Sequence, residues 1–339
     1  MPLLSRETVP PPIRGPRKSQ TAILAAKLVI TLTCFWYLFQ HIDIAELRRT
    51  LPDLQITWAV LAVLLLAVQI PLVALRWLDI VRVLEMRSEG LTYLSMTVAV
   101  AIGQFFGQIL PVIAGDGFRV WYLTRFKIDW RDATTSVVID RCVGIGLLLS
   151  LAFAILFLPS SLGLFGDNRG KIIAALGVML IAGVVSLVVG EHLSRAFADR
   201  RHAAWIASFF SGARRVIFGP RSASILGIGC VIHLLTIAAV WVLGRAQGLM
   251  LSPADAAVLF AVMMGVALVP FSIGGWGLRE LAMVSLFGNY GLTPERALVF
   301  SMYFGLACIV ASLPGAVTWF AFLIPRPERS SERGPGTAP

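Results

Sequence analysis

The stretch LPVIAGDGFR, residues 110–119, and the related stretch VPFSIGGWGLRE, residues 269–280, decide how this chain folds. Each interrupts a long apolar run, at about 92–113 and at about 256–290, with proline, glycine and charged residues. Proline removes a backbone donor and glycine relaxes a helix, so both runs are expected to break. Irregular backbone at membrane depth is tolerated only where protein or a water-filled cavity surrounds it. We therefore expect two broken, re-entrant hairpins within a helical membrane protein.

The composition indicates that lipid is part of the solvent of this chain. Its 339 residues are 57% hydrophobic and 14% charged, with a mean hydropathy of +0.81, whereas soluble domains carry about 25% charged residues. The net charge of +10 lies mostly in short loops, so it does not indicate nucleic acid. The four cysteines stand alone in apolar runs, which argues against a disulfide framework or a zinc site. We expect no metal and no cofactor.

The predicted fold class is an all-α polytopic membrane protein with about six full transmembrane helices and the two broken hairpins, because a span needs about 20 apolar residues. The predicted full spans are 21–39, 54–79, 133–158, 171–190, 222–244 and 296–324. Together they form one membrane domain over residues 21–324. The flanking segments 1–20 and 325–339 are expected to be disordered cytoplasmic tails.

The distribution of Lys and Arg predicts the orientation. If both hairpins leave the membrane on the side they entered, the segments on the side of the N-terminus hold 21 Lys and Arg, and those on the other side hold 7. Cytoplasmic loops carry the excess of positive charge. We therefore expect a multi-pass inner-membrane protein with both termini and the basic loop 191–221 in the cytoplasm.

The same layout predicts an inverted repeat. Each half contains two helices, a broken hairpin and a long helix, and the pattern Leu-Pro-x3-Gly-Asp-x2-Arg in one half corresponds to Val-Pro-x3-Gly-Gly-x3-Arg in the other. The two halves start from opposite faces of the membrane. Inverted repeats with broken helices recur in transporters, which bind substrate near the midplane at the repeat interface.

Charged residues beside the breaks are the candidate substrate-binding groups. Arg119, Arg141 and Arg279 are expected to contact an anionic group such as a lipid phosphate, since a guanidinium donates two parallel hydrogen bonds to such oxygens. The acidic residues near them are expected to position them or to bind a coupling cation, and the glycines to expose backbone donors. The full candidate set is Pro111, Gly115, Asp116, Arg119, Asp140, Arg141, Pro270, Gly274, Gly275, Gly277, Arg279 and Glu280.

A second interpretation of these charges stays open: they pair with one another and let the helices pack. Among the other polar residues of the apolar runs, Gln69 and His233 are expected to hydrogen-bond between helices. Arg76 is expected to extend to the cytoplasmic interface. Trp77 is expected to be one of the interfacial anchors, with Trp58 and Trp121.

These motifs resemble those of the lysylphosphatidylglycerol synthase transmembrane region, a flippase-like family of inner-membrane proteins. The resemblance rests on Leu110–Arg119, on Asp140-Arg141 with Gly144, and on Pro270–Glu280, and it covers about residues 21–324. In the full-length synthase this region precedes a soluble aminoacyl-transfer domain and is thought to move the aminoacylated lipid outward. This sequence ends about 15 residues after the last predicted helix, so lysyl transfer is not expected of it.

The function expected from the residues and the resemblance is translocation of a lipid or lipid-linked substrate. The alternative is a membrane-embedded accessory or transferase-like component of lipid or glycan synthesis that works with a separate soluble enzyme. No nucleotide-binding, hydrolase or metalloprotease motif occurs in the required context, so we expect no enzyme activity and assign no catalytic residue. The expected partners are membrane lipids, either an anionic phospholipid or a lipid-linked glycan, and no nucleic acid. A soluble biosynthetic enzyme and further copies of the chain are the protein partners left open.

Overall fold

The computed structural model describes residues 54–86, 90–110, 112–157, 169–196, 201–267, 276–288 and 293–323, together with isolated residues between 28 and 40. The helices in chain order are α3 (Ile56–Ala67), α4 (Gln69–Val83), α5 (Tyr93–Ile109), α6 (Val112–Thr124), α7 (Trp130–Ile155), α9 (Arg169–Ala196), α10 (Arg201–Phe218), α11 (Ser222–Ala246), α12 (Pro253–Ala267), α13 (Leu278–Phe287) and α14 (Pro294–Leu323). The described residues form no strand. The prediction of an all-helical chain is therefore confirmed.

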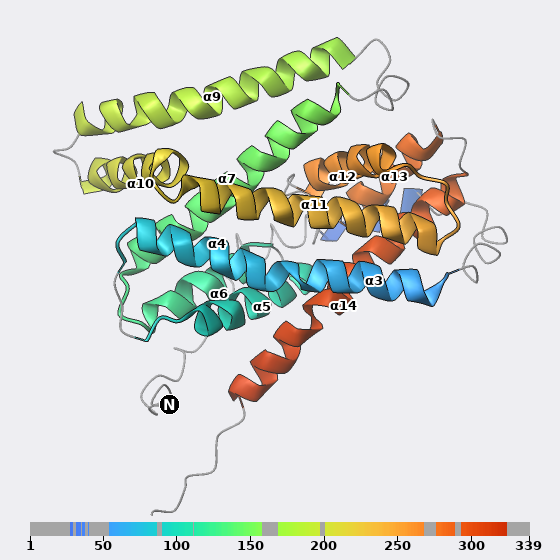
Figure 1. Ribbon diagram of the computed structural model, residues 1–339, viewed down its shortest axis with the longest axis horizontal. Helices are drawn as coiled ribbons and strands as arrows, with labels where there is room; N and C mark the ends of the chain where they lie inside the picture. The colour runs from blue at the N-terminus through green and yellow to red at the C-terminus, as the bar shows by residue number, and fades with distance from the viewer. Residues whose placement is uncertain are drawn as a thin grey trace, which may run out of the picture. The chain divides into compact units, whose positions relative to one another are not determined.

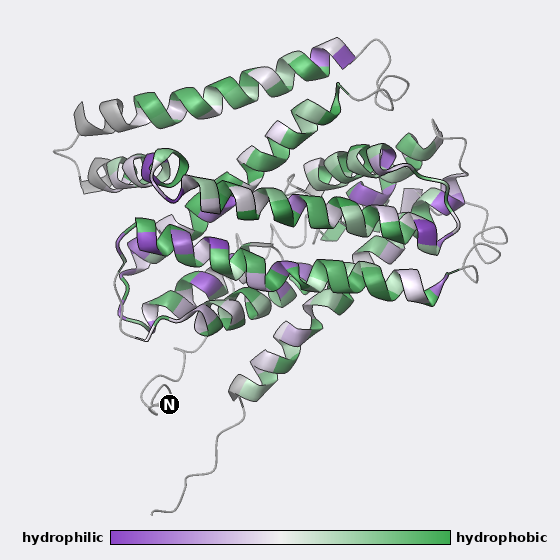
Figure 2. Ribbon diagram, viewed as in Figure 1, coloured by the Kyte–Doolittle hydropathy of each residue, from purple (hydrophilic) through white to green (hydrophobic). Residues whose placement is uncertain are grey.

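Five helical segments of the described residues are long and apolar enough to cross a membrane. They are Ile56–Val83, which joins α3 and α4, Trp130–Ile155, Arg169–Gly190, Ser222–Ala246 and Pro294–Ala321. Each overlaps one of the predicted spans. The remaining predicted span, 21–39, lies largely outside the described residues, as do the predicted tails 1–20 and 325–339. The hydropathy colouring in Figure 2 shows these helices as mostly apolar along their length.

The chain divides into two compact units. The larger contains Asp53–Ala261 and Tyr303–Pro339, and the smaller contains Met1–Pro52 and Val262–Met302. Helices α12 and α14 contribute residues to both units.

In the larger unit, α3 and α4 run on end to end and lie antiparallel to α11 (Figure 1). At one end, the backbone N–H of Gln55 donates to the carbonyl of Ala246 at 2.7 Å. At the other, Arg221 and Ser224 of the start of α11 both donate to the buried carboxylate of Asp79, each at 2.9 Å. Both ends of this long helix pair are therefore fixed by hydrogen bonds.

Helices α5 and α6 form a tight hairpin around the first break. Leu110 has an extended backbone, as expected for a residue that precedes proline, and Pro111 itself lies outside the described residues. A Cβ atom added to Gly115 would lie 2.1 Å from the carbonyl oxygen of Gly103. The two helix backbones therefore touch, and only glycine fits at position 115. Helix α6 continues to Thr124, well past the end at 113 that the sequence predicted for this stretch.

The predicted loop 191–221 was assigned wrongly, because most of it is helical. Helix α10 occupies 201–218 and packs on α9, α7 and α4. Its Ala213 and Val216 are buried, and Phe209 packs against the same apolar cluster. The spacing of these residues places them on one face of the helix. Three of the basic residues of this segment, Arg201, Arg214 and Arg215, share the helix with this apolar face.

The second predicted break falls between α12 and α13. Residues 268–275, which include Pro270, Gly274 and Gly275, lie outside the described residues. The described backbone resumes at Trp276, and Gly277 there has a φ of +87°, a conformation that favours glycine.

Candidate functional site

In the larger unit, one buried carboxylate receives two arginines from two other helices. Asp140 of α7 accepts from Nε of Arg76 on α4 at 2.9 Å and from a terminal nitrogen of Arg119 on α6 at 2.8 Å. All three residues are buried, with relative exposures of 2% to 6%. Charges taken out of water are costly unless they are paired and hydrogen-bonded. The shared carboxylate of Asp140 therefore links α4, α6 and α7, and the buried charge of each residue is stabilised by the opposite charges next to it.

Arg119 is held by a tryptophan as well as by a carboxylate. Its guanidinium lies over the ring of Trp77 at 4.1 Å from the centroid. The indole N–H of Trp77 donates to Ser136 Oγ on α7 at 3.2 Å, which fixes the ring. The side chain of Arg119 also lies against Gly103, where an added Cβ would be 3.1 Å from its Cγ. The close contact of α5 with α6 therefore also positions this arginine.

One donor of Arg119 is unsatisfied. Among the buried side-chain atoms of the described residues, its Nε is the one that has no hydrogen-bond partner. An unpaired buried donor costs about 1–3 kcal/mol, and more when the group is charged. Arg119 therefore keeps one donor unpaired at the centre of this charged group.

A second ion pair extends the cluster toward the surface. Nε and Nη2 of Arg141 donate to the Asp116 carboxylate at 2.8–3.0 Å, and Arg119 Nη1 is 3.8 Å from the same carboxylate. The side chain of Arg141 is 50% exposed and that of Asp116 is 23% exposed. The Asp140 cluster, defined as Arg76, Asp116, Arg119, Asp140 and Arg141, therefore reaches from the interior to an accessible edge.

The Asp140 cluster carries one excess positive charge, because three arginines face two aspartates. A glycine of α7 packs against it. A Cβ atom at Gly144 would lie 3.7 and 3.8 Å from the two terminal nitrogens of Arg76. His233 of α11 hydrogen-bonds the carbonyl of Gly144 at 3.1 Å. The site is thus suited to a single negative charge with oxygen acceptors.

The smaller unit holds a separate buried pair. Arg279 donates to the Glu280 carboxylate through Nε at 3.0 Å and Nη2 at 2.6 Å, and Nε also lies 3.0 Å from Ser301 Oγ on α14. Ser301 donates to Glu280 at 2.9 Å. The backbone N–H of Gly277 donates to Glu280 at 2.6 Å, which caps the start of α13. This group, with the Trp276 ring 4.7 Å from Arg279, is the Glu280 cluster.

The predicted site residues that the structure describes therefore fall into two groups. The larger unit brings together Asp116, Arg119, Asp140 and Arg141. Gly115 lies next to them, at the contact between α5 and α6. Gly277, Arg279 and Glu280 meet in the smaller unit. Pro111, Pro270, Gly274 and Gly275 lie outside the described residues.

Two expectations for α4 were wrong. Arg76 does not extend to the interface, since it is buried against Asp140, and Trp77 is fully buried rather than an interfacial anchor. The predicted span ends at 79, so both residues were expected near its end. The helix continues to Val83, so both lie inside it. An arginine within an apolar run was the signal that pointed to Arg76.

The expected interhelical hydrogen bonds are confirmed. Thr236 of α11 donates to Gln69 of α4 at 3.3 Å, and His233 contacts the carbonyl of Gly144 on α7. Both pairs hold α11 against neighbouring helices.

The chain matches the model of a known protein family over most of its length. The family model of the lysylphosphatidylglycerol synthase TM region matches residues 24–315. A comparison with curated proteins found no match. The matched segment includes both clusters and the described helices from α3 to α13, and it ends at residue 315 within α14. The chain is therefore a multi-pass membrane protein that belongs to the lysylphosphatidylglycerol synthase transmembrane-region family.

Proposed function

We propose that this protein is a flippase-like translocator of a lipid or lipid-linked substrate with an anionic head group, in the bacterial inner membrane. The observation that carries the proposal is the Asp140 cluster, in which three arginines face two aspartates and the buried Nε of Arg119 has no acceptor. A phosphate would supply both the missing acceptor and the missing negative charge.

The roles within the cluster follow from its contacts. Arg119 and Arg141 engage the head group, while Asp140 and Asp116 hold the guanidinium planes in place. Arg76, which shares Asp140, adds terminal donors beside Gly144. Arg279 is the corresponding group of the smaller unit, positioned by Glu280. Because each arginine is already fixed, little side-chain entropy is lost when the substrate binds.

We further propose that the two broken stretches are re-entrant and related by an inverted repeat. Helices α5 and α6 have 17 and 13 residues, which gives about 26 and 20 Å at ~1.5 Å per residue, short of the ~30 Å hydrocarbon core. In both clusters an arginine after the break contacts a tryptophan ring. In both clusters this arginine also hydrogen-bonds a polar residue of the next long helix. Arg119 bonds Asp140, which lies 21 residues later, and Arg279 bonds Ser301, which lies 22 residues later.

Reconstitution tests the proposed activity directly. The purified full-length protein is placed in vesicles that contain tail-labelled fluorescent phosphatidylglycerol or phosphatidylcholine, and dithionite is used to quench the outer leaflet. We expect the protein to accelerate transbilayer movement of the anionic lipid, and Arg119→Gln to abolish this. Arg82→Gln is the matched control, because Arg82 lies on α4 with a side chain that is 53% exposed. No acceleration for any anionic lipid would refute translocation.

The alternative function, an accessory or transferase-like role, predicts a different result. In that case lipid products would form in the presence of a soluble enzyme without transbilayer movement. We propose that the chain alone has no transferase activity, so purified protein supplied with lysyl-tRNA and phosphatidylglycerol should make no lysyl lipid. Robust formation of that product would refute this assignment.

A further inference from the structure

His233 lies near the middle of the 25-residue helix α11. Among the described residues, it is the one histidine in the five segments that are long and apolar enough to span a membrane. It is half-buried. Its contact with Gly144 holds α11 against α7, but its charge has no part in the roles assigned above. Histidine changes charge between about pH 5 and pH 8, so a proton can be taken up or released at this position.

The hydrogen bond of His233 leaves its second ring nitrogen available for a proton. Nε2 lies 3.1 Å from the carbonyl oxygen of Gly144. A carbonyl oxygen can only accept, so Nε2 carries a hydrogen and, in the neutral ring, Nδ1 does not. No described residue hydrogen-bonds Nδ1. Proton uptake at Nδ1 would therefore change the charge of the ring while the contact between α11 and α7 is kept.

His233 and Arg76 have two neighbours in common. The terminal nitrogens of Arg76 lie 3.7 and 3.8 Å from the Cβ position of Gly144, the residue that His233 bonds. One of these nitrogens also lies 3.3 Å from the Cβ position of Gly229 on α11, about one helical turn before His233. The imidazole ring is therefore within about one helical turn of the buried guanidinium that donates to Asp140.

The other helices that pack on α11 present mainly apolar groups to its middle. Helix α3 has no ionisable side chain, and α12 presents Phe260, whose ring centroid is 5.6 Å from that of His233. Helix α10 packs near Ile225, about two turns before His233. The charged side chains of α10, α11 and α12 lie toward the helix ends and are Arg201, Arg214, Arg215, Arg245 and Asp255. Arg76 and Asp140 are thus the charged groups that face this part of α11.

The net charge of the Asp140 cluster links protonation of His233 to occupancy of the site. Three arginines face two aspartates, so the empty site already carries one excess positive charge. A further positive charge beside Arg76 is repelled while the site is empty. A bound anion cancels the excess and attracts an imidazolium. Each event therefore favours the other, and by linkage the two effects on affinity are equal in size.

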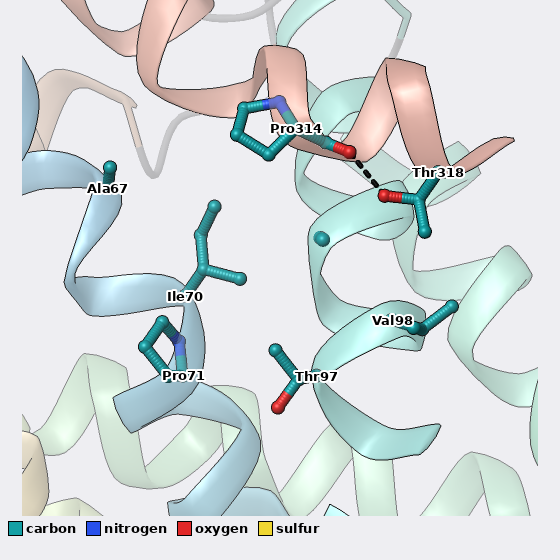
Figure 3. Close-up of a pocket in the computed structure, with 8 residues that line it drawn as sticks. Ala67, Ile70, Pro71, Thr97, Val98, Pro314 and Thr318 are labelled. Atoms are coloured by element: carbon teal, nitrogen blue, oxygen red, sulfur yellow. Dashed lines mark hydrogen bonds between the residues drawn. The ribbon is translucent and has the colours of Figure 1, made fainter. Parts of the chain in front are cut away.

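The pocket in the larger unit has no group that could take this role. It opens between the α3–α4 junction, α5 and the last part of α14 (Figure 3). Its walls contain no ionisable side chain, and the residues that form them are Ala67, Ile70, Pro71, Thr97, Val98, Ala101, Pro314 and Thr318. Proton coupling through the described residues of this pocket is therefore excluded.

We propose that binding of the anionic head group at the Asp140 cluster is coupled to uptake of a proton by Nδ1 of His233, so that the anion and the proton are carried together. The inference rests on the proposed function and adds the coupling ion to it. His233 acts through the charge of the site and is a coupling residue, whereas the arginines contact the head group.

The pH profile of transport tests this coupling. The full-length protein is placed in vesicles with phosphatidylglycerol that carries a fluorescent short acyl chain, and albumin extracts the outer leaflet at each pH. The phosphodiester of this probe stays ionised throughout, so its own charge does not change. We expect transport to rise by roughly tenfold as the pH falls from about 8 to about 5.5, because a proton on His233 favours binding of the head group.

His233→Gln separates titration from the helix contact. The glutamine amide can still donate to the Gly144 carbonyl, but it does not titrate. We expect this variant to keep the thermal stability of the wild type and to transport at one low rate at every pH. His202→Gln is the matched control, because it removes a histidine of α10, outside the spanning segments, and its pH profile should follow the wild type. If His233 only held the helices together, His233→Gln would also follow the wild type and only His233→Ala would lose transport, which would overturn the proposal.

Proton uptake on binding gives a readout that does not depend on transport. Short-chain phosphatidylglycerol is added to the purified full-length protein in weakly buffered detergent near neutral pH, and an indicator dye follows the protons. We expect the wild type to take up as much as about one proton per chain and His233→Gln to take up none. Absence of uptake by the wild type would refute the coupling, whether or not the lipid moves in vesicles. Uptake without transbilayer movement would refute translocation and leave the coupling standing.

Discussion

At the scale of single residues, removing the charge of Arg119 and removing the charge of Asp140 change the net charge of the Asp140 cluster in opposite directions. Removing Arg119 leaves Arg76 on Asp140 and Arg141 on Asp116, so two positive charges face two negative ones. Removing the charge of Asp140 leaves both Arg76 and Arg119 without their shared partner. The two substitutions therefore separate loss of a substrate contact from loss of stability.

We expect Arg119→Gln to abolish lipid transport while the thermal stability in detergent stays close to that of the wild type. Asp140→Asn should lower stability, by roughly 3–5 kcal/mol if the buried charges stay unpaired. Arg119→Lys should restore little transport, because lysine lacks the planar fork that bonds Asp140 and stacks on Trp77. If Arg119 served packing alone, neutralising all three charges that meet there, in the triple variant Arg76→Gln, Arg119→Gln and Asp140→Asn, would regain both stability and transport.

The Glu280 cluster gives a second test at this scale. Arg279→Ala should abolish transport, and it should also destabilise the protein, because Glu280 is completely buried and an unpaired buried charge costs roughly 3–5 kcal/mol. Arg279→Ala combined with Glu280→Ala should recover stability but not transport. Both properties are measured on the same purified variants. Recovery of transport in the double variant would show that Arg279 does not contact substrate.

The sequence predicted most of the charged residues of these clusters but not which residue each one pairs with. Adjacent residues on a helix point about 100° apart, so Asp140 and Arg141 face different helices: Asp140 bonds Arg76 and Arg119, and Arg141 bonds Asp116. Which helices lie on each side is decided by packing, and no local pattern reports it. Arg76 was missed for this reason.

At the scale of elements, the contact of α5 with α6 sets the position of Arg119. We expect Gly115→Ala to destabilise the protein by roughly 1–3 kcal/mol through overpacking, since its Cβ would lie 2.1 Å from the Gly103 carbonyl, and to reduce transport. Gly117→Ala on the same helix is the control, because nothing lies within 4 Å of its Cβ. That substitution should be neutral or stabilising by up to about 1 kcal/mol. Equal melting temperatures for the two variants would contradict a tight hairpin.

The sequence predicted the break between α5 and α6 because proline acts locally on the residue before it. It did not predict α10. Basic residues alternate with the apolar face of this helix, which is formed by Phe209, Ala213 and Val216. The helix therefore does not reach the length or hydropathy of a membrane span. Long, uniformly apolar helices are therefore predictable from composition, whereas a short amphipathic helix is recognised only from the face that it packs.

At the scale of the whole molecule, the orientation is the property that the charge distribution predicts. The 21 Lys and Arg assigned to one side and 7 to the other predict that both termini and residues 191–221 lie in the cytoplasm. To test this, the four native cysteines are first replaced, and single cysteines are then introduced as Phe165→Cys, Ser208→Cys and Ser330→Cys. Ser208 is an exposed position of α10, so its substitution leaves the packed face of that helix intact. In intact cells, a membrane-impermeant thiol reagent should label position 165 and should reach 208 and 330 only after permeabilisation. Labelling of position 208 from outside would place α10 on the outer face, and both the orientation and the re-entrant hairpins on which it depends would then be wrong.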